Sequence, residues 1–195
     1  MSPNTREPTT TLTAGDDRAI SALLTMAALG GAVAVALGTY GRVHTPSGQA
    51  IASFGFPSVL PMKAWFATGA ATLALAQLAS ALWMWGRLPG VGAAPGGVAV
   101  AHRWLGTAAF VLTVPVAYHC LWSLGFQQTS TRVMMHSVLG CAFYGAFVTK
   151  MLVLRSRRAP GWALPAVGGL MVAVLTGIWA TSSYWFFTNV GFPGV

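Results

Sequence analysis

Apolar residues along this chain come in five long runs, and short segments with polar or charged side chains separate them. A membrane-spanning α-helix needs about 20 predominantly apolar residues, because each residue adds about 1.5 Å toward a hydrocarbon thickness of about 30 Å. The runs therefore predict five transmembrane helices, at about residues 19–40, 62–85, 98–124, 132–154 and 162–187. Pro115 lies inside the third run and is expected to bend that helix. The pattern predicts an all-α polytopic membrane protein, a bundle of five transmembrane helices.

The segments outside the runs complete the expected organisation. Residues 1–18 are rich in Thr, Pro, Asn and Asp, which is typical of a disordered tail, and they lack the basic start and immediate apolar core of a signal peptide. Residues 19–195 are expected to form one transmembrane domain. Residues 41–61 connect the first two helices, and their mixture of Gly, Pro and aromatic residues favours an ordered cap.

Charged residues make up only 7% of the chain, and the net charge of +8 comes from 11 basic and 3 acidic side chains. All three acids precede the first apolar run, so no carboxylate is expected within the membrane, which argues against a carboxylate proton relay. Most basic residues lie in the tail or near the second and fourth connections: Arg6, Arg18, Arg87, Arg103, Lys150, Arg155, Arg157 and Arg158. This bias predicts a cytoplasmic N-terminus and a C-terminus outside. No soluble basic segment with interleaved aromatics occurs, so no nucleic-acid partner is expected.

Three of the four histidines, His102, His119 and His136, lie in the hairpin of the third and fourth predicted helices. The centre of the turn falls near Gln128, nine residues after His119 and eight before His136. In an antiparallel hairpin both histidines therefore lie roughly 12 Å below the turn, in the outer half of the membrane. Two facing imidazoles at one depth are the arrangement that a bis-histidine haem b requires.

The neighbours of His136 fit a haem site. Gly140 follows one helical turn later on the same face, and a glycine there would let a flat macrocycle approach the backbone. Arg132 precedes His136 by one turn and could pair with a haem propionate.

The pattern recurs around His102, with Gly106 one turn further along. His102 lies about 25 Å along the helix from His119, too far to share one haem. It could ligate a second, inner haem, although no other histidine is predicted at that depth. His44 follows the first helix on the outer side and could hydrogen-bond a quinol or accept its proton.

Two other interpretations remain open. His44, His119 and His136 could together hold copper or zinc at the outer side, since three imidazoles suit either ion. Alternatively, the histidines serve only as hydrogen-bonding groups between helices, and the chain is a structural subunit of a larger complex.

At HRWLG (102–106), YHC (118–120) and HSVLG (136–140), the chain resembles small membrane b-type cytochromes. It is similar in style to the ascorbate-linked ferric-reductase cytochromes and to quinone-linked haem anchors. That resemblance implies electron transfer between membrane quinol and an outer-face redox protein, or subunits of a respiratory complex, through haem b. The di-haem members use four membrane histidines, whereas this hairpin offers three.

The whole chain, including GRVHTP and MKAWFATGAA, also resembles an uncharacterised family of small integral-membrane proteins from actinobacteria. This second resemblance implies a bacterial plasma membrane and no particular chemistry.

Overall fold

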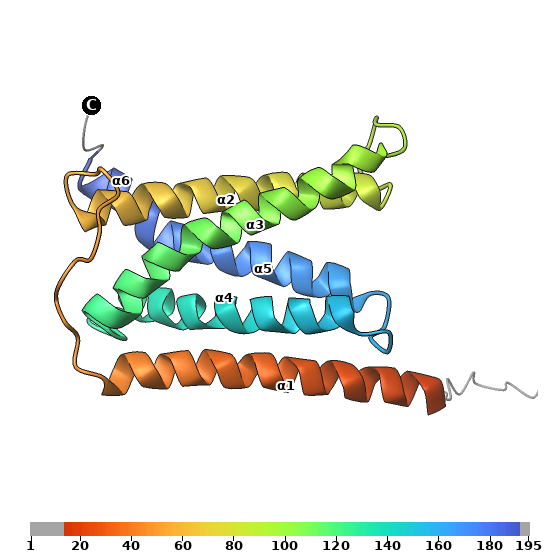
Figure 1. The fold of residues 1–195 in the computed structure, drawn as a ribbon, viewed down its shortest axis with the longest axis horizontal. Helices are drawn as coiled ribbons and strands as arrows, with labels where there is room; N and C mark the ends of the chain where they lie inside the picture. The colour runs from red at the N-terminus through yellow and green to blue at the C-terminus, as the bar shows by residue number, and fades with distance from the viewer. Residues whose placement is uncertain (1–13, 192–195) are drawn as a thin grey trace, which may run out of the picture.

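The computed structural model describes residues 14–191, and the regular structure in this range is entirely helical (Figure 1). In chain order the helices are α1 (Ala14–Val43), α2 (Val59–Met84), α3 (Gly96–Tyr118), the π-helix η1 (His119–Leu124), α4 (Thr131–Arg155), α5 (Ala163–Trp179), the π-helix η2 (Ala180–Tyr184) and α6 (Trp185–Asn189). Because η1 continues α3, and η2 and α6 continue α5, the helices form five rods. Each rod is long and apolar enough to cross a membrane. The predicted all-α architecture with five such helices is confirmed.

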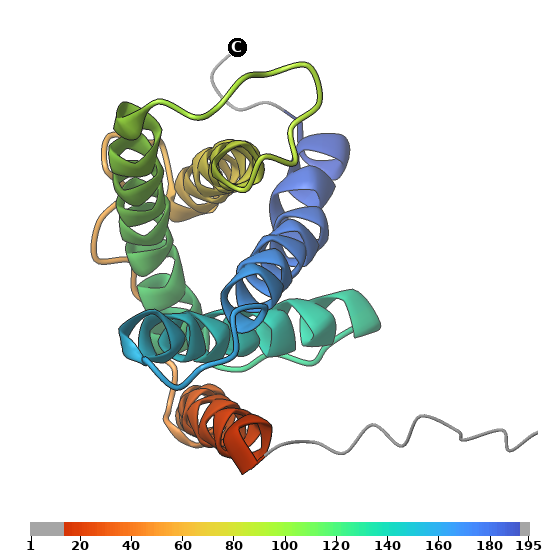
Figure 2. The same ribbon diagram turned by 90° about the vertical axis from the view of Figure 1, so that its right-hand side faces the viewer.

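Helices α2, α3, α4 and α5 surround a common interior, and α1 lies outside this group against α4 (Figure 2). Neighbouring main chains approach closely between α2 and α3, α4 and α5, and α2 and α5. The space between α3 and α4 is bridged largely by side chains, for example by the stacked rings of Phe110 and Phe147, whose centroids are 4.1 Å apart. The buried centre is formed by Ala70, Phe143, Val174, Leu175 and Ile178.

The connections divide between the two ends of the bundle (Figure 1). One end, called here the loop end, carries residues 44–58, the turn at 125–130 and α6. The other, called the tail end, carries the start of α1 and the connections at 85–95 and 156–162. The start of α1 and the end of α6 therefore lie at opposite ends, as an odd number of spans requires.

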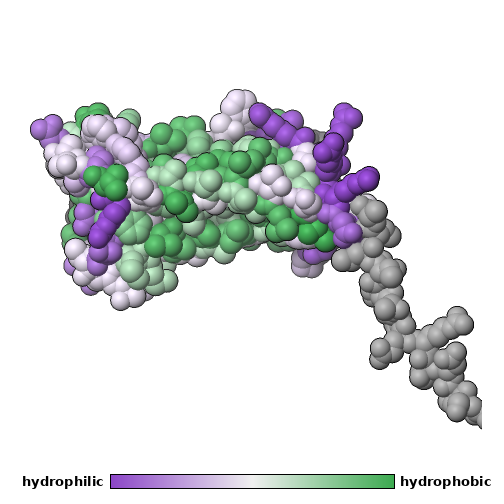
Figure 3. Space-filling view, turned by 90° about the horizontal axis from the view of Figure 1, so that it is seen from below, coloured by the Kyte–Doolittle hydropathy of each residue, from purple (hydrophilic) through white to green (hydrophobic). Residues whose placement is uncertain are grey.

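The surface between these ends is apolar. Large hydrophobic side chains stand exposed along the rods, such as Leu24 at 64%, Val35 at 69% and Val111 at 59%. Figure 3 shows a hydrophobic band between two more polar ends on the face that includes α1. Such a band has a favourable environment in lipid and not in water, so the helices fit a multi-pass membrane protein.

The helix boundaries differ from the expected ones chiefly at the first helix. Residues 14–18, predicted to belong to a disordered tail, form the beginning of α1, and the rest of that predicted tail lies outside the described residues. Asp16 and Asp17 occupy the first turn, where their charges interact favourably with the positive end of the helix dipole. Two hydrophilic carboxylates therefore belong to the helix although they are outside the apolar run.

Helix α1 docks on α4 through glycines. A Cβ built on Gly145 would lie 2.5 Å from the carbonyl oxygen of Gly30 and 3.0 Å from the Cβ of Ala34. A Cβ built on Gly30 would in turn collide with the Gly145 carbonyl and the Thr149 hydroxyl. Small residues at four-residue spacing on both helices thus allow direct backbone contact, as is common between membrane helices.

Candidate functional site

Helix α3 ends in an unusual way, and this ending shapes the loop end. Pro115 supplies no amide donor, and four residues later the helix widens into the π-helix η1. The loop that follows α1 satisfies the free carbonyls of η1, since the Ser47 amide donates to Trp122 O (3.2 Å). The Ser123 hydroxyl donates to Gln49 O (2.6 Å). Residues 44–51 are therefore fastened to η1 and form the ordered cap that their composition favours.

His119 begins η1 and is only 3% exposed. Its Nδ1 lies 2.7 Å from Pro115 O, and because a carbonyl only accepts, Nδ1 carries the proton. The Nε2 lone pair accepts the Ile51 amide hydrogen at 3.3 Å. A backbone carbonyl that holds Nδ1–H is the usual arrangement around a metal-binding histidine, but here the lone pair is directed at the cap.

His136, in the second turn of α4, holds the same tautomer. Its Nδ1 lies 3.3 Å from Thr181 Oγ1. The Thr181 hydroxyl donates its hydrogen to Gly177 O at 2.7 Å, so its oxygen is free to accept from Nδ1–H of His136. Nε2 of His136 consequently carries the lone pair.

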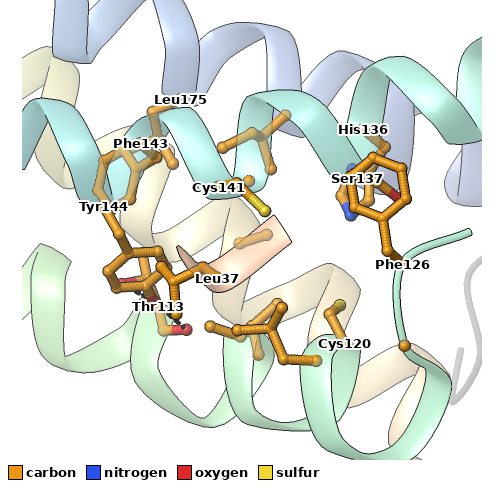
Figure 4. Close-up of a pocket in the computed structure, with 17 residues that line it drawn as sticks. Leu37, Thr113, Cys120, Phe126, His136, Ser137, Cys141, Phe143, Tyr144 and Leu175 are labelled. Carbon is orange, nitrogen blue, oxygen red and sulfur yellow. Dashed lines mark hydrogen bonds between the residues drawn. The ribbon is translucent and has the colours of Figure 1, made fainter. Parts of the chain in front are cut away.

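A cavity of about 90 Å³ lies between α3 and α4 and is called here the α3–α4 cavity (Figure 4). His136 stands at one end of it, and Gly140 lines it with no atom within 4 Å of a built Cβ. Most of the other walls are apolar, with Val116 from α3 and Leu37 from α1 among them. His136 and Gly140 therefore line the same apolar cavity.

A second cavity, of about 240 Å³, adjoins the first at the loop end and is called here the cation-lined cavity. Its walls come from the starts of α2 and α4, the end of α3 with η1, and η2 with α6. Lys63 and Arg132 line it together with His136. The Arg132 guanidinium donates to Thr181 O at 2.6 Å and lies 4.0 Å above the ring of Trp185, so it is held in place.

The structure does not place His119 on either cavity, although His136 lines both. Equal depth below the turn does not set the direction of a side chain, and the π-helical turn at His119 changes the rotation of the residues that follow Pro115. A ligand role for His119 therefore stays a prediction, and it would require Nε2 to exchange its hydrogen bond with Ile51.

The three histidines proposed for copper or zinc are not assembled. Within residues 14–191 no three His, Cys, Asp or Glu side chains come together as a metal-binding group. His44 is engaged elsewhere, because its Nε2 donates to Trp122 O at 3.0 Å and its ring stacks on Tyr40 at 4.6 Å between centroids. Its contacts join α1 to η1, and it lines neither cavity.

His102 forms part of a polar contact between α2 and α3 in the half of the bundle toward the tail end. The Ser80 hydroxyl lies 2.8 Å from His102 Nδ1, and the Gln77 amide donates to the His102 carbonyl at 2.6 Å. A Cβ on Gly106 would collide with the Gln77 side chain. In this structure the Gln77 side chain fills the space beside Gly106, and a second haem at His102 stays a prediction.

Comparison with known proteins places the chain in a family. Residues 23–194 match a family described as a family of unknown function, DUF6529. The chain belongs to the DUF6529 family. No curated protein and no solved structure matches it.

The match covers all or most of each of the five membrane-spanning helices of this DUF6529 protein, so both cavities belong to the family's shared region. The sequence predicted His136, Gly140 and Arg132 as site residues, and Lys63 was not among the predicted site residues. One feature of the sequence could have indicated Lys63. It lies four residues into α2, at the loop end of the bundle, where Arg132 also lies. Thr181 and Trp185, which hold His136 and Arg132, carry no signal that distinguishes them from other residues of an apolar helix.

Proposed function

We propose that this DUF6529 protein is a membrane b-type cytochrome that carries electrons between membrane quinol and a redox partner. One observation carries the proposal: His136 lines an apolar cavity between two helices, and Gly140, one helical turn away, lines the same cavity. A flat apolar cofactor with an imidazole ligand needs these features.

The residues of the α3–α4 cavity fit haem b in part. His136 would supply one axial ligand, since Thr181 already fixes its Nδ1–H. Gly140 would keep the wall of α4 thin, and the apolar side chains would exclude water. His119 has the matching tautomer and would supply a second ligand after it releases Ile51. Bound haem would contribute one-electron chemistry, while the protein sets its potential and access.

The charge distribution supports an orientation for this proposal. Of the basic residues in the described range, Arg18, Arg87, Arg103, Lys150, Arg155, Arg157 and Arg158 lie toward the tail end. Arg42, Lys63 and Arg132 lie toward the loop end. By the positive-inside rule the tail end faces the cytoplasm, and both cavities lie in the outer half of the membrane. The redox partner, a soluble protein or respiratory-complex subunits, would then bind at the outer face of a bacterial plasma membrane.

The test is absorption spectroscopy of the protein purified in mild detergent from haem-sufficient cells. We expect a sharp reduced α-band of haem b that His136→Ala abolishes. His102→Ala is the matched control, because it also removes a membrane histidine but leaves both cavities intact, and it should keep the band. A second ligand at His119 predicts that His119→Ala converts the spectrum from low spin to high spin.

A colourless preparation, or a band that survives His136→Ala unchanged, would refute the proposal. Addition of a quinol analogue to the oxidised protein then tests the electron donor, since the proposal expects the α-band to form without dithionite.

A further inference from the structure

None of the described residues that line the cation-lined cavity is acidic. Within the described residues the acids are Asp16 and Asp17, and both lie in the first turn of α1 at the tail end. The cavity lies at the loop end, and α1 alone extends about 45 Å between the two ends by its length of 30 residues. Among residues 14–191, no carboxylate therefore lies at the cavity to neutralise Lys63 and Arg132.

Helix geometry adds to this positive charge. Lys63 lies in the second turn of α2, and Arg132 lies in the first turn of α4. Both helices therefore direct the positive ends of their dipoles toward the region where the two cations lie. Cations are normally favoured at the opposite end of a helix, and anions at this one.

The two cations differ in how far their hydrogen-bonding capacity is satisfied. Arg132 donates to Thr181 O and stacks on Trp185. No hydrogen bond or ion pair joins the Lys63 ammonium to another described residue. A half-buried lysine that shares a cavity with an arginine in a membrane protein is unfavourable unless an anion compensates both charges.

From these observations we propose that the cation-lined cavity binds the oxyanion, a carboxylate or a phosphate, of an amphipathic molecule. The oxyanion lies between Lys63 and Arg132, and Arg132 offers it the planar donors that suit such groups. The apolar part of the molecule packs on Leu60, Val116 and Leu124, which form walls of the same cavity. The Trp185 ring, 4.0 Å from the guanidinium, also lines this cavity.

Two kinds of molecule carry this chemistry at this depth in a membrane. Haem bears two propionates, and a haem in the adjoining α3–α4 cavity would bring them close because His136 lines both spaces. Acidic lipids bear a carboxylate or phosphate head. The inference does not require haem, since it rests on Lys63, Arg132 and the two helix termini.

The experiment uses the purified protein and dibromostearate, a fatty acid whose bromines quench nearby tryptophans. Dibromostearate methyl ester is the neutral probe, and brominated phosphatidic acid is the phosphate probe. Trp185 is the reporter, so Trp185→Phe should remove the saturable part of the quenching. We expect the two acids to quench saturably and the ester to quench only weakly at equal concentration.

The paired variant Lys63→Gln with Arg132→Gln should raise the half-saturating concentration by at least about ten-fold, because it removes the charge-assisted hydrogen bonds to the oxyanion. Lys63→Gln alone should raise the half-saturating concentration by a smaller factor. This variant keeps the Arg132 contact with Thr181, so it still tests the inference if the paired variant fails to fold. Arg42→Gln is the matched control. It removes an exposed cation at the same end, outside the cavity, and should change binding by less than about two-fold.

Equal quenching by the acid and its ester, or equal binding by Lys63→Gln and the native protein, would overturn the inference. Added haem separates the two sources. Displacement of dibromostearate by haem assigns the oxyanion to the propionates, and retention assigns it to a lipid. A protein that binds no haem still undergoes the lipid test, so failure of the cytochrome proposal is distinguishable from failure of this one.

Discussion

Replacement of Gly145 by alanine should separate α1 from α4. The added methyl group would lie 2.5 Å from Gly30 O and 3.0 Å from Ala34 Cβ. Both neighbours belong to the α1 helix itself, so neither can turn aside as a long side chain would. Helix α1 must therefore move outward, and it packs chiefly on α4, with a smaller contact to η1.

The expected cost follows from these contacts. Relief of such an overlap requires a shift of roughly 1 Å, and insertion of a methyl group into a tightly packed site costs about 1–3 kcal/mol. Replacement of glycine by alanine inside a helix returns about 0.5–1 kcal/mol. By the difference of these two contributions, the net loss of stability should be about 1 kcal/mol, within a span of about 0–2.5 kcal/mol. Leu37 of α1 forms a wall of the α3–α4 cavity, so the same change should loosen the site.

Cross-linking measures the approach of the two helices directly. A Cβ at position 38 lies 3.8 Å from Cys141 Sγ, so Gly38→Cys places two thiols in contact across the α1–α4 interface. In a background with Cys120→Ser, the rate of oxidative cross-linking should fall several-fold when Gly145→Ala is added. Gly31→Ala is the control, because a Cβ there meets nothing within 4 Å. Equal rates for Gly145→Ala and Gly31→Ala would refute the packing argument.

Two further predictions follow from single hydrogen bonds. Tyr144→Phe removes the hydroxyl that donates to Thr113 across the space between α4 and α3, at 3.1 Å from both Thr113 oxygens. It should lower the stability by about 1 kcal/mol in thermal unfolding in detergent, and an unchanged melting temperature would contradict the role of this bridge. Ser123→Ala releases the Gln49 carbonyl and should speed proteolysis within residues 44–58 with little change in melting temperature, while Ser156→Ala at the tail end should not. Equal cleavage rates in the two serine variants would show that this bond does not fasten the cap.

The helices were predictable because lipid imposes a simple rule: each span must satisfy its own backbone and present apolar side chains. The runs located every span, and the errors lie at the ends. Asp16 and Asp17 show why. Hydropathy excludes two carboxylates from a membrane helix, whereas the helix dipole favours them in its first turn. The helix therefore extends beyond its apolar run.

The sequence predicted how far along their helices the candidate residues lie, but it did not predict the orientation of every side chain. His136 and Gly140 share a cavity because a regular α-helix places residues four apart on one face. His119 follows Pro115 and begins a π-helix, so the regular spacing no longer gives its orientation. Lys63 lines the same cavity as His136 but belongs to another helix, and no periodicity within one segment reveals which helices become neighbours.

The hydrogen bonds of the four histidines show which of them could serve most readily as a cofactor ligand. His44 and His102 join helices or loops through the protein's own oxygens, and neither lines a cavity described here. His136 has its Nδ1 beside the Thr181 hydroxyl, and its side chain lines the α3–α4 cavity. His119 lies between these cases, because its Nδ1–H is fixed but its lone pair accepts the Ile51 amide at 3.3 Å, a long hydrogen bond. A ligand on His119 and this bond exclude each other, so a haem held by both His119 and His136 would require the cap to move, whereas one held by His136 alone would not.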